Sequence, residues 1–183
     1  ARHRFQADLA LRYGADEVIC PGREDPARAL ARATGARLLR PRLGRDVLIG
    51  GADVVYECGG SAGSLAEALR LTGSGGRVVL VGLVSVVRGV DWTPIWLKEL
   101  TVRGSFWCSA EDFEGRPVDP FRQTLAWMAE GRLDLASLVT HRFRLADYRR
   151  ALAVTLDKGR HRVVKSVFVF DGCDSGTVGR PLA

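Results

Sequence analysis

Two segments of the chain are nearly continuous runs of apolar residues, and a glycine ends or closely follows each run. The runs are "ADVVYEC" at residues 52–58 and "RVVLVG" at residues 77–82. Strands buried on both faces of a parallel sheet have such runs, whereas half-exposed strands alternate apolar and polar residues. The pattern therefore predicts two parallel strands that are covered on both faces.

A helix and a short strand are predicted before the first run. Apolar Phe5, Leu9 and Tyr13 recur at helical spacing from almost the first residue, and Gly14 closes the pattern. The segment "DEVIC" at residues 16–20 is rich in residues typical of strands. The sequence therefore predicts a helix and then a strand within the first 20 residues.

Capping residues place a second helix. Asp25 is a suitable N-cap, Pro26 fits the first helical position, and Gly35 follows the end. A third helix is predicted from Ser64 onward. The sequence "GSGG" at residues 73–76 is predicted to form a turn before the second apolar run.

The rest of the chain continues the alternation of strands and helices. Further strands are predicted at residues 100–106, 139–145 and 165–170, and further helices at residues 119–132 and 146–160. The expected fold class is α/β: a partial doubly wound, Rossmann-like parallel sheet, followed by a C-terminal strand–helix–strand segment.

The ends of the two apolar runs are candidate ligand-binding positions, because ligands of doubly wound sheets bind outside the carboxyl ends of the strands. Glycine there lets the backbone approach a flat ligand or adopt a positive φ, and N–H groups at the start of the helix from Ser64 would offer donors. Tight turns without a ligand are an alternative explanation. Glu57 is either a buried acid or a ribose contact, and both remain open. The candidate residues are Cys58, Gly59, Gly60, Val81, Gly82 and Leu83.

Charge and hydropathy exclude several classes of protein. The net charge is +6, but the 27 Lys and Arg residues are spread through every predicted element, so nucleic acid is not an expected partner. No apolar run approaches the ~20 residues of a membrane span. The charged N-terminal stretch does not resemble a signal peptide. We therefore expect a soluble, cytoplasmic protein.

Cysteine and histidine positions indicate neither a disulfide framework nor a metal site, because the residues are far apart and at no recognised ligand spacing. We expect reduced cysteines and no metal ligands, and we assign no catalytic residue in this chain. The residues concerned are Cys20, Cys58, Cys108, Cys173, His3, His141 and His161.

Four segments together resemble a known family. They are "LALRYGADEVI", "GADVVYECGGSAGSLAEALRLTGSGGRVVLVG", "ELTVRGSF" and "VTHRFRLADYRRALAVTLDKGRHRVVKSVFVF". In this order and spacing they are similar to the C-terminal part of the zinc-type alcohol dehydrogenases, members of the medium-chain dehydrogenase/reductase family. The resemblance extends from residue 1 to about residue 170.

The resemblance implies a fragment of a longer protein. Family members begin with a catalytic domain that carries the zinc ligands, followed by a G-x-G-x-x-G turn for the pyrophosphate, and neither is recognisable here. It implies a partial dinucleotide-binding domain at residues 1–138 and a segment at residues 139–170 that packs on the catalytic domain. The tail at residues 171–183 is rich in Gly, Ser and Asp, and we expect it to be disordered. Zinc would belong only to the missing catalytic domain.

The resemblance also implies cofactor contacts. By position, Cys58–Gly60 would face the cofactor ribose and Val81–Leu83 the nicotinamide. Ser105 and Trp107 would hold the carboxamide, and Lys165 would meet the pyrophosphate.

The N-terminal residues bear on the choice of cofactor. Family members specific for NAD have an acidic residue at the end of the second strand. The matching position here is Ala1, and basic Arg2 and Arg4 follow it. The resemblance therefore favours NADP, with Arg2 as the first candidate for the 2′-phosphate contact and Arg4 as the second, and NAD remains the alternative.

The function that the resemblance implies is hydride transfer between NAD(P) and a small-molecule alcohol or carbonyl in the intact protein. We expect the chain alone to be inactive, and we expect a homodimer through strand 100–106. A non-catalytic nucleotide-binding or dimerisation module is the alternative, and a methyltransferase with a doubly wound sheet has less support.

Overall fold

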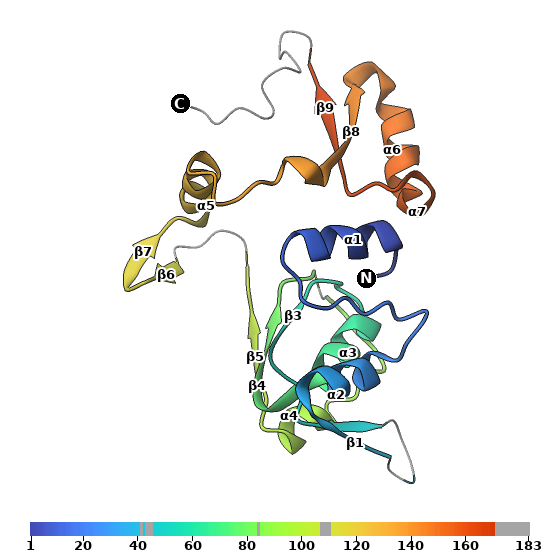
Figure 1. Ribbon diagram of the computed structural model, residues 1–183, viewed down its shortest axis with the longest axis vertical. Helices are drawn as coiled ribbons and strands as arrows, with labels where there is room; N and C mark the ends of the chain where they lie inside the picture. The colour runs from blue at the N-terminus through green and yellow to red at the C-terminus, as the bar shows by residue number, and fades with distance from the viewer. Residues whose placement is uncertain (41, 43–45, 84, 107–110, 171–183) are drawn as a thin grey trace. The chain divides into compact units, whose positions relative to one another are not determined.

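The computed structural model describes residues 1–40, 42, 46–83, 85–106 and 111–170 (Figure 1). The chain divides into two compact units, Ala1–Trp107 and Cys108–Ala183, and each is described by itself. The predicted domain boundaries at residues 138 and 170 stay predictions. The segment 171–183, expected to be disordered, lies outside the described residues.

The first unit is built on a parallel sheet of three strands in the order β3–β4–β5. The strands are β3 (Ala52–Glu57), β4 (Thr72–Leu80) and β5 (Thr101–Gly104). Val55 pairs with Val78, and Val78 pairs with Val102. This parallel sheet confirms the predicted α/β class, and its three strands finish at the same edge (Figure 1).

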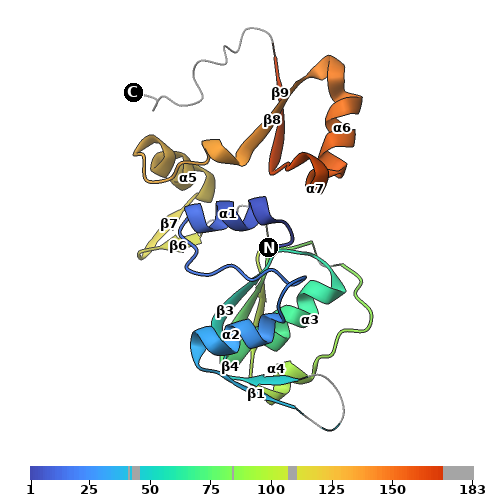
Figure 2. The same ribbon diagram turned by 45° about the vertical axis from the view of Figure 1, so that its right-hand side comes forward.

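Helix α3 (Ala62–Leu71) connects β3 to β4 and contacts both strands (Figure 2). It begins two residues before the predicted Ser64, because Ser61 caps it. Its buried residues Leu65, Ala68 and Leu69 share one helical face and form the core with Val78 and Leu100. This packing fixes the start of α3 beside the end of β3.

The prediction that both apolar runs are buried on both faces is wrong for β3. Val55 is half-buried toward the core, but its neighbours Val54 and Tyr56 are 41% and 66% exposed. Successive side chains of a strand point to opposite faces, so the face away from the core is open along β3.

The predicted "GSGG" turn lies inside β4. The register pairs Ala52 with Thr72 and then Val54 with Arg77, so residues 73–76 stand opposite Asp53 alone. Gly75 has a φ of 70°, and its N–H donates to the carbonyl of Lys98 at 2.7 Å. The glycines therefore form an irregularity within the strand rather than a turn before it.

The first two helices confirm the predicted capping. Helix α1 spans Arg4–Arg12, and Gly14 after it has a φ of 92°. Helix α2 spans Pro26–Thr34; the carboxylate of Asp25 accepts the Arg28 N–H at 3.0 Å, and Gly35 is left-handed.

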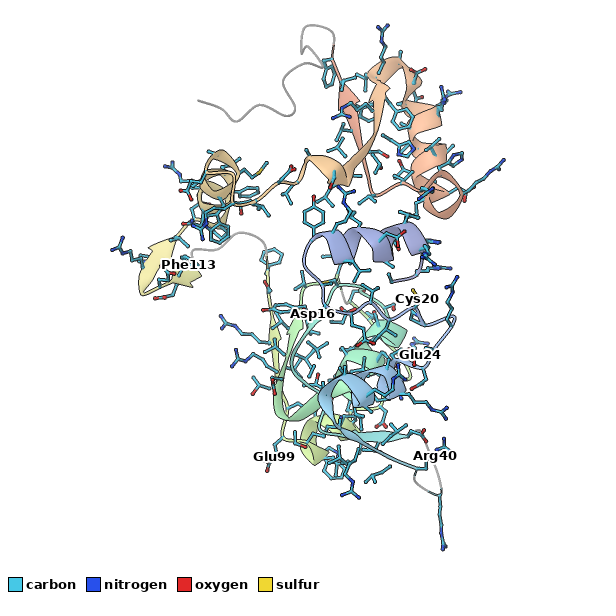
Figure 3. All side chains as sticks on the ribbon, in the orientation of Figure 1. Asp16, Cys20, Glu24, Arg40, Glu99 and Phe113 are labelled. Carbon is cyan, nitrogen blue, oxygen red and sulfur yellow. The ribbon has the colours of Figure 1, made fainter. Side chains whose placement is uncertain are left out.

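The predicted strand at residues 16–20, between the labelled Asp16 and Cys20 in Figure 3, is wrong: no strand is assigned there. A strand needs a hydrogen-bonded neighbour. The described strands pair only among themselves, so this segment has no such neighbour among them. An antiparallel hairpin that was not predicted follows α2, formed by β1 (Arg37–Leu39) and β2 (Val47–Ile49).

The connection between β4 and β5 contains a short helix, α4 (Thr93–Leu97). Glu99 then has a φ of 54° and precedes β5 at the end of the sheet opposite to the candidate site (Figure 3). Strand β5 is shorter than the predicted 100–106, since the ladder ends at Gly104.

The second unit confirms the predicted order of its main elements. Helix α5 falls within the predicted 119–132, and the last two strands pair in parallel with α6 between them. The hairpin of β6 and β7 was not predicted. The elements are β6 (Glu111–Phe113), β7 (Arg116–Val118), α5 (Pro120–Ala129), η1 (Ala136–Leu138), β8 (Val139–Arg144), η2 (Leu145–Asp147), α6 (Tyr148–Leu156), α7 (Lys158–His161) and β9 (Lys165–Val169).

The helices of the described segments are too short or too polar to cross a membrane.

Candidate functional site

The predicted site residues of the first unit lie where β3 and β4 end. The carbonyl oxygen of Glu57, the last residue of β3, accepts hydrogen bonds from Val81 N–H at 2.9 Å and Gly82 N–H at 2.7 Å. The segment after β4 is thus fixed to the end of β3. The structure brings together the two loops, residues 58–60 and 81–83, that the sequence analysis placed at one edge.

Gly60 and Gly82 are in close contact, and a side chain at either position would crowd the opposite loop. A Cβ atom on Gly82 would lie 2.5 Å from the Gly60 nitrogen, well inside any normal contact. Gly60 has a φ of 69°, and a Cβ there would lie 3.1 Å from the Leu83 nitrogen. The absence of side chains therefore allows the two backbones to pack directly together.

The carboxylate of Glu57 organises the first loop. Its Oε1 accepts hydrogen bonds from Gly59 N–H at 2.8 Å and Gly60 N–H at 2.9 Å. The residue is only 2% exposed. Burial raises its pKa, but hydrogen bonds from the Ser64 hydroxyl and from the N–H groups of Gly60 and Gly59 lower the pKa by more, so it stays below its ordinary value.

The start of α3 closes the same loop with a reciprocal cap. The Ser61 hydroxyl accepts the Ser64 N–H at 3.1 Å, and the Ser64 hydroxyl accepts the Ser61 N–H at 3.0 Å. The Ser64 N–H, expected to face a ligand, is therefore used within the cap. The serine pair three residues apart was the sequence signal for this cap, and it was missed.

The end of β5 adjoins the two loops. Ser105 N–H donates to the Leu80 carbonyl at 2.9 Å, which places the Ser105 backbone beside the start of the second loop. Ser105 itself is exposed. Trp107, predicted to share its role, lies outside the described residues.

Several predicted contact residues are open to solvent. Cys58 is an exposed free thiol, and Val81 and Leu83 are 47% and 91% exposed. Exposed apolar side chains beside a glycine backbone can pack against a flat ligand. These three residues therefore surround the glycine contact with accessible surface.

The predicted basic contacts, Arg2, Arg4 and Lys165, belong to other elements than the two loops. Arg2 precedes α1, and Arg4 begins it; both are exposed, and Arg4 Nε lies 3.6 Å from Asp8 Oδ1. Helix α1 lies beyond the end of the sheet at which its strands finish (Figure 2). Lys165 is exposed at the start of β9 and belongs to the second unit.

The described residues do not fit a catalytic zinc site. In this part of the chain, no three His, Cys, Asp or Glu side chains are placed to hold a metal ion. Cys108 and Cys173 lie outside the described residues.

Three known proteins illustrate what this chain is similar to. L-threonine 3-dehydrogenase from Anaeromyxobacter dehalogenans (strain 2CP-C) is 28% identical over 150 residues, which cover 82% of this chain and 37% of that protein. A crystal structure from Sinorhizobium meliloti 1021, bound to NADP, is 25% identical with a TM-score of 0.64, covering 93% of this chain and 44% of that one. The crystal structure of a short chain alcohol dehydrogenase from Escherichia coli CFT073, complexed with NADH, is 20% identical with a TM-score of 0.67. The match covers 93% of this chain and 43% of that one, and it shows that the two share a fold.

This chain thus spans less than half the length of each of these proteins. A family model described as zinc-binding dehydrogenase matches residues 1–123, more than half of the chain. The chain therefore belongs to the zinc-binding dehydrogenase family.

Proposed function

We propose that this chain supplies part of the cofactor-binding site of an NAD(P)-dependent oxidoreductase, which transfers a hydride between the nicotinamide and an alcohol or carbonyl. The observation that carries the proposal is the contact between Gly60 and Gly82. It leaves two stretches of bare backbone at the carboxyl ends of parallel strands, where ligands of doubly wound sheets bind.

The residues around this contact suit a nicotinamide cofactor. Cys58–Gly60 and Val81–Leu83 would bind it through backbone and apolar surface, and Ser105 would provide a polar backbone group. Trp107 and Lys165 remain candidate contacts by family position. When bound, the nicotinamide accepts or donates the hydride, while these residues orient the ring.

The substrate side of the reaction is assigned to no residue. The family uses zinc to polarise the substrate oxygen, but the described residues do not fit a zinc site. Since the chain spans 37% of the threonine dehydrogenase that it matches, we propose only the class of alcohols and carbonyls as substrates. We expect no turnover by the 183-residue chain alone.

We propose NADP rather than NAD as the cofactor. The neighbours support both, since one crystal structure holds NADP and another NADH. The preference rests on two observations. Arg2 and Arg4 carry positive charge at the start of α1, and position 1 is an alanine rather than an acidic residue.

We also propose that the protein forms a dimer through β5. This strand pairs only with β4 among the described strands, so its other edge has unpaired backbone groups. Pairing with β5 of a second copy would satisfy them.

The test of cofactor binding is a titration of the purified, isotope-labelled chain with NADPH, followed by NMR. We expect the amide signals of Gly59, Gly60 and Gly82 to shift with saturable dependence on concentration. Gly22 is exposed, and a Cβ there meets no atom within 4 Å, so Gly22→Ala should bind in the same way. A folded chain whose three glycine signals do not respond at millimolar NADPH would contradict the proposal.

A further inference from the structure

Glu57 forms hydrogen bonds to both candidate loops at the same time. Its side-chain Oε1 accepts the N–H groups of Gly59 and Gly60, at 2.8 and 2.9 Å. Its main-chain oxygen accepts the N–H groups of Val81 and Gly82. The two loops are therefore connected through a single residue at the end of β3.

The second carboxylate oxygen of Glu57 shows that the side chain does not face a ligand. Oε2 is buried and has no hydrogen-bond partner among the described residues. It lies against Gly82, where a Cβ atom would be 2.6 Å away. An oxygen closed off by backbone cannot accept a hydrogen bond from a ribose hydroxyl without movement of the loop.

Leaving one oxygen of a buried carboxylate unsatisfied costs free energy. The cost is offset by charge-assisted bonds to two N–H groups, which are stronger than bonds to a neutral acceptor. An apolar residue at position 57 would avoid the cost but would leave the Gly59 and Gly60 N–H groups without this acceptor. The carboxylate at position 57 thus leaves one oxygen unsatisfied but holds the loop in one geometry.

We propose that Glu57 is a positioning residue that fixes the Cys58–Gly60 loop against Gly82, so that the cofactor-binding backbone is formed before the cofactor binds. The expected effect of Glu57 on cofactor affinity rests on the proposed function. The alternative of a direct ribose contact is disfavoured by the burial of both carboxylate oxygens.

The test compares amide hydrogen exchange and NADPH affinity in the full chain and in Glu57→Leu. Protection of the Gly59 and Gly60 amides should fall about tenfold or more, because each loses its acceptor. The Val81 and Gly82 amides, which bond to the main chain of residue 57, should keep their protection relative to the core. General destabilisation would instead lower all four together. NADPH binding should weaken about tenfold.

A second variant, Glu57→Gln, keeps the oxygen acceptor but removes the charge. A neutral acceptor makes weaker bonds, so Glu57→Gln should lose part of the protection at Gly59 and Gly60 and less of it than Glu57→Leu, while Val81 and Gly82 keep theirs. A loss confined to the first two amides decides the matter if Glu57→Leu does not fold. If the wild-type chain does not bind NADPH but the exchange pattern appears, the proposed function fails and the positioning role stands. Unchanged protection of Gly59 and Gly60 in Glu57→Leu, or equal loss at all four amides, would overturn the inference.

Discussion

The ammonium group of Lys98 donates a hydrogen bond of 2.9 Å to the carbonyl oxygen of Thr72, and both residues are almost fully buried. A second bond of 2.8 Å joins Lys98 Nζ to the Arg70 carbonyl in the last turn of α3. A lysine from the connection after β4 therefore satisfies carbonyls where α3 ends and β4 begins. Burial and the positive charge of Arg70 both lower the pKa of Lys98.

The first prediction concerns this lysine. Lys98→Met should reduce the free energy of unfolding by about 1–3 kcal/mol, because two buried carbonyl groups lose their donor. Urea unfolding followed by circular dichroism measures the change. Lys158→Met, at an exposed position, is the matched control and should change stability by less than about 0.5 kcal/mol. Equal stability of the two variants would show that Lys98 is dispensable.

The second prediction concerns the glycine contact. Gly82→Ala should separate the two loops, because its Cβ would collide with the Gly60 nitrogen and Glu57 Oε2. We expect NADPH affinity to fall about tenfold or more and stability to drop by about 1–3 kcal/mol. Calorimetry and urea unfolding measure the two effects, with Gly22→Ala as control. Normal affinity in Gly82→Ala would mean that the loops need not touch.

The third prediction is a pH dependence due to Glu57, whose pKa is lowered in the folded protein. The unfolded chain then binds the proton more readily than the folded protein. The stabilisation that ionised Glu57 contributes is therefore fully present above the pKa of Glu57 in the unfolded chain, near 4.5. It is lost as the pH falls through the lower, folded pKa. The stability difference between the wild type and Glu57→Gln should therefore shrink from pH 6 to pH 3. A difference that is constant over this range would contradict the ionised state of Glu57.

The fourth prediction concerns assembly through β5. Ser105 N–H points toward β4, and N–H groups alternate along a strand, so the Val102 N–H points to the open edge and that of Arg103 to β4. Val102→Pro should therefore raise the dimer dissociation constant about tenfold while preserving the fold.

Arg103→Pro is the contrasting variant for this prediction, because it should remove a bond to β4 and destabilise the sheet itself. Analytical ultracentrifugation at micromolar concentration measures the assembly. A monomeric wild-type chain under these conditions would count against the dimer.

The fifth prediction concerns the phosphate of NADP. Arg2→Ala should weaken binding of NADPH by about tenfold and leave NADH binding unchanged, since only the former has a 2′-phosphate. Arg4→Ala should have a smaller effect, because Arg4 already pairs with Asp8. Arg12→Ala, on the same helix, is the control for net charge. Tighter binding of NADH than of NADPH by the wild type would exclude the preference.

Local signals in the sequence were sufficient for the elements whose residues determine their own conformation. Asp25, Pro26 and Gly35 mark both ends of α2, and the structure confirms each of them. The segment at residues 16–20 has equally suitable residues for a strand, yet strand formation depends on a neighbour that is far away in the sequence. The same limit applies to β3, whose exposed Val54 and Tyr56 depend on what covers the sheet.

The candidate site was likewise only partly predictable from local sequence signals. The glycines at positions 59, 60 and 82 could be singled out because they end or follow apolar runs, but the contact between Gly60 and Gly82 depends on the register of β3 and β4. The role of Glu57 could not be decided from the sequence, because burial and ligand contact both favour an acid there. Only the location of its two oxygens separates these possibilities.

The direct packing of Gly60 on Gly82 determines where cofactor preference can be engineered. In a mutant library that randomises position 60 or 82, most variants would have disrupted loops. Changing both positions at once would not help, because each added side chain would meet the opposite backbone. The side chains at positions 2, 4 and 83 are exposed, so substitutions there do not force the two loops apart. Diversity concentrated at these three positions should therefore give a far larger fraction of folded, selectable variants.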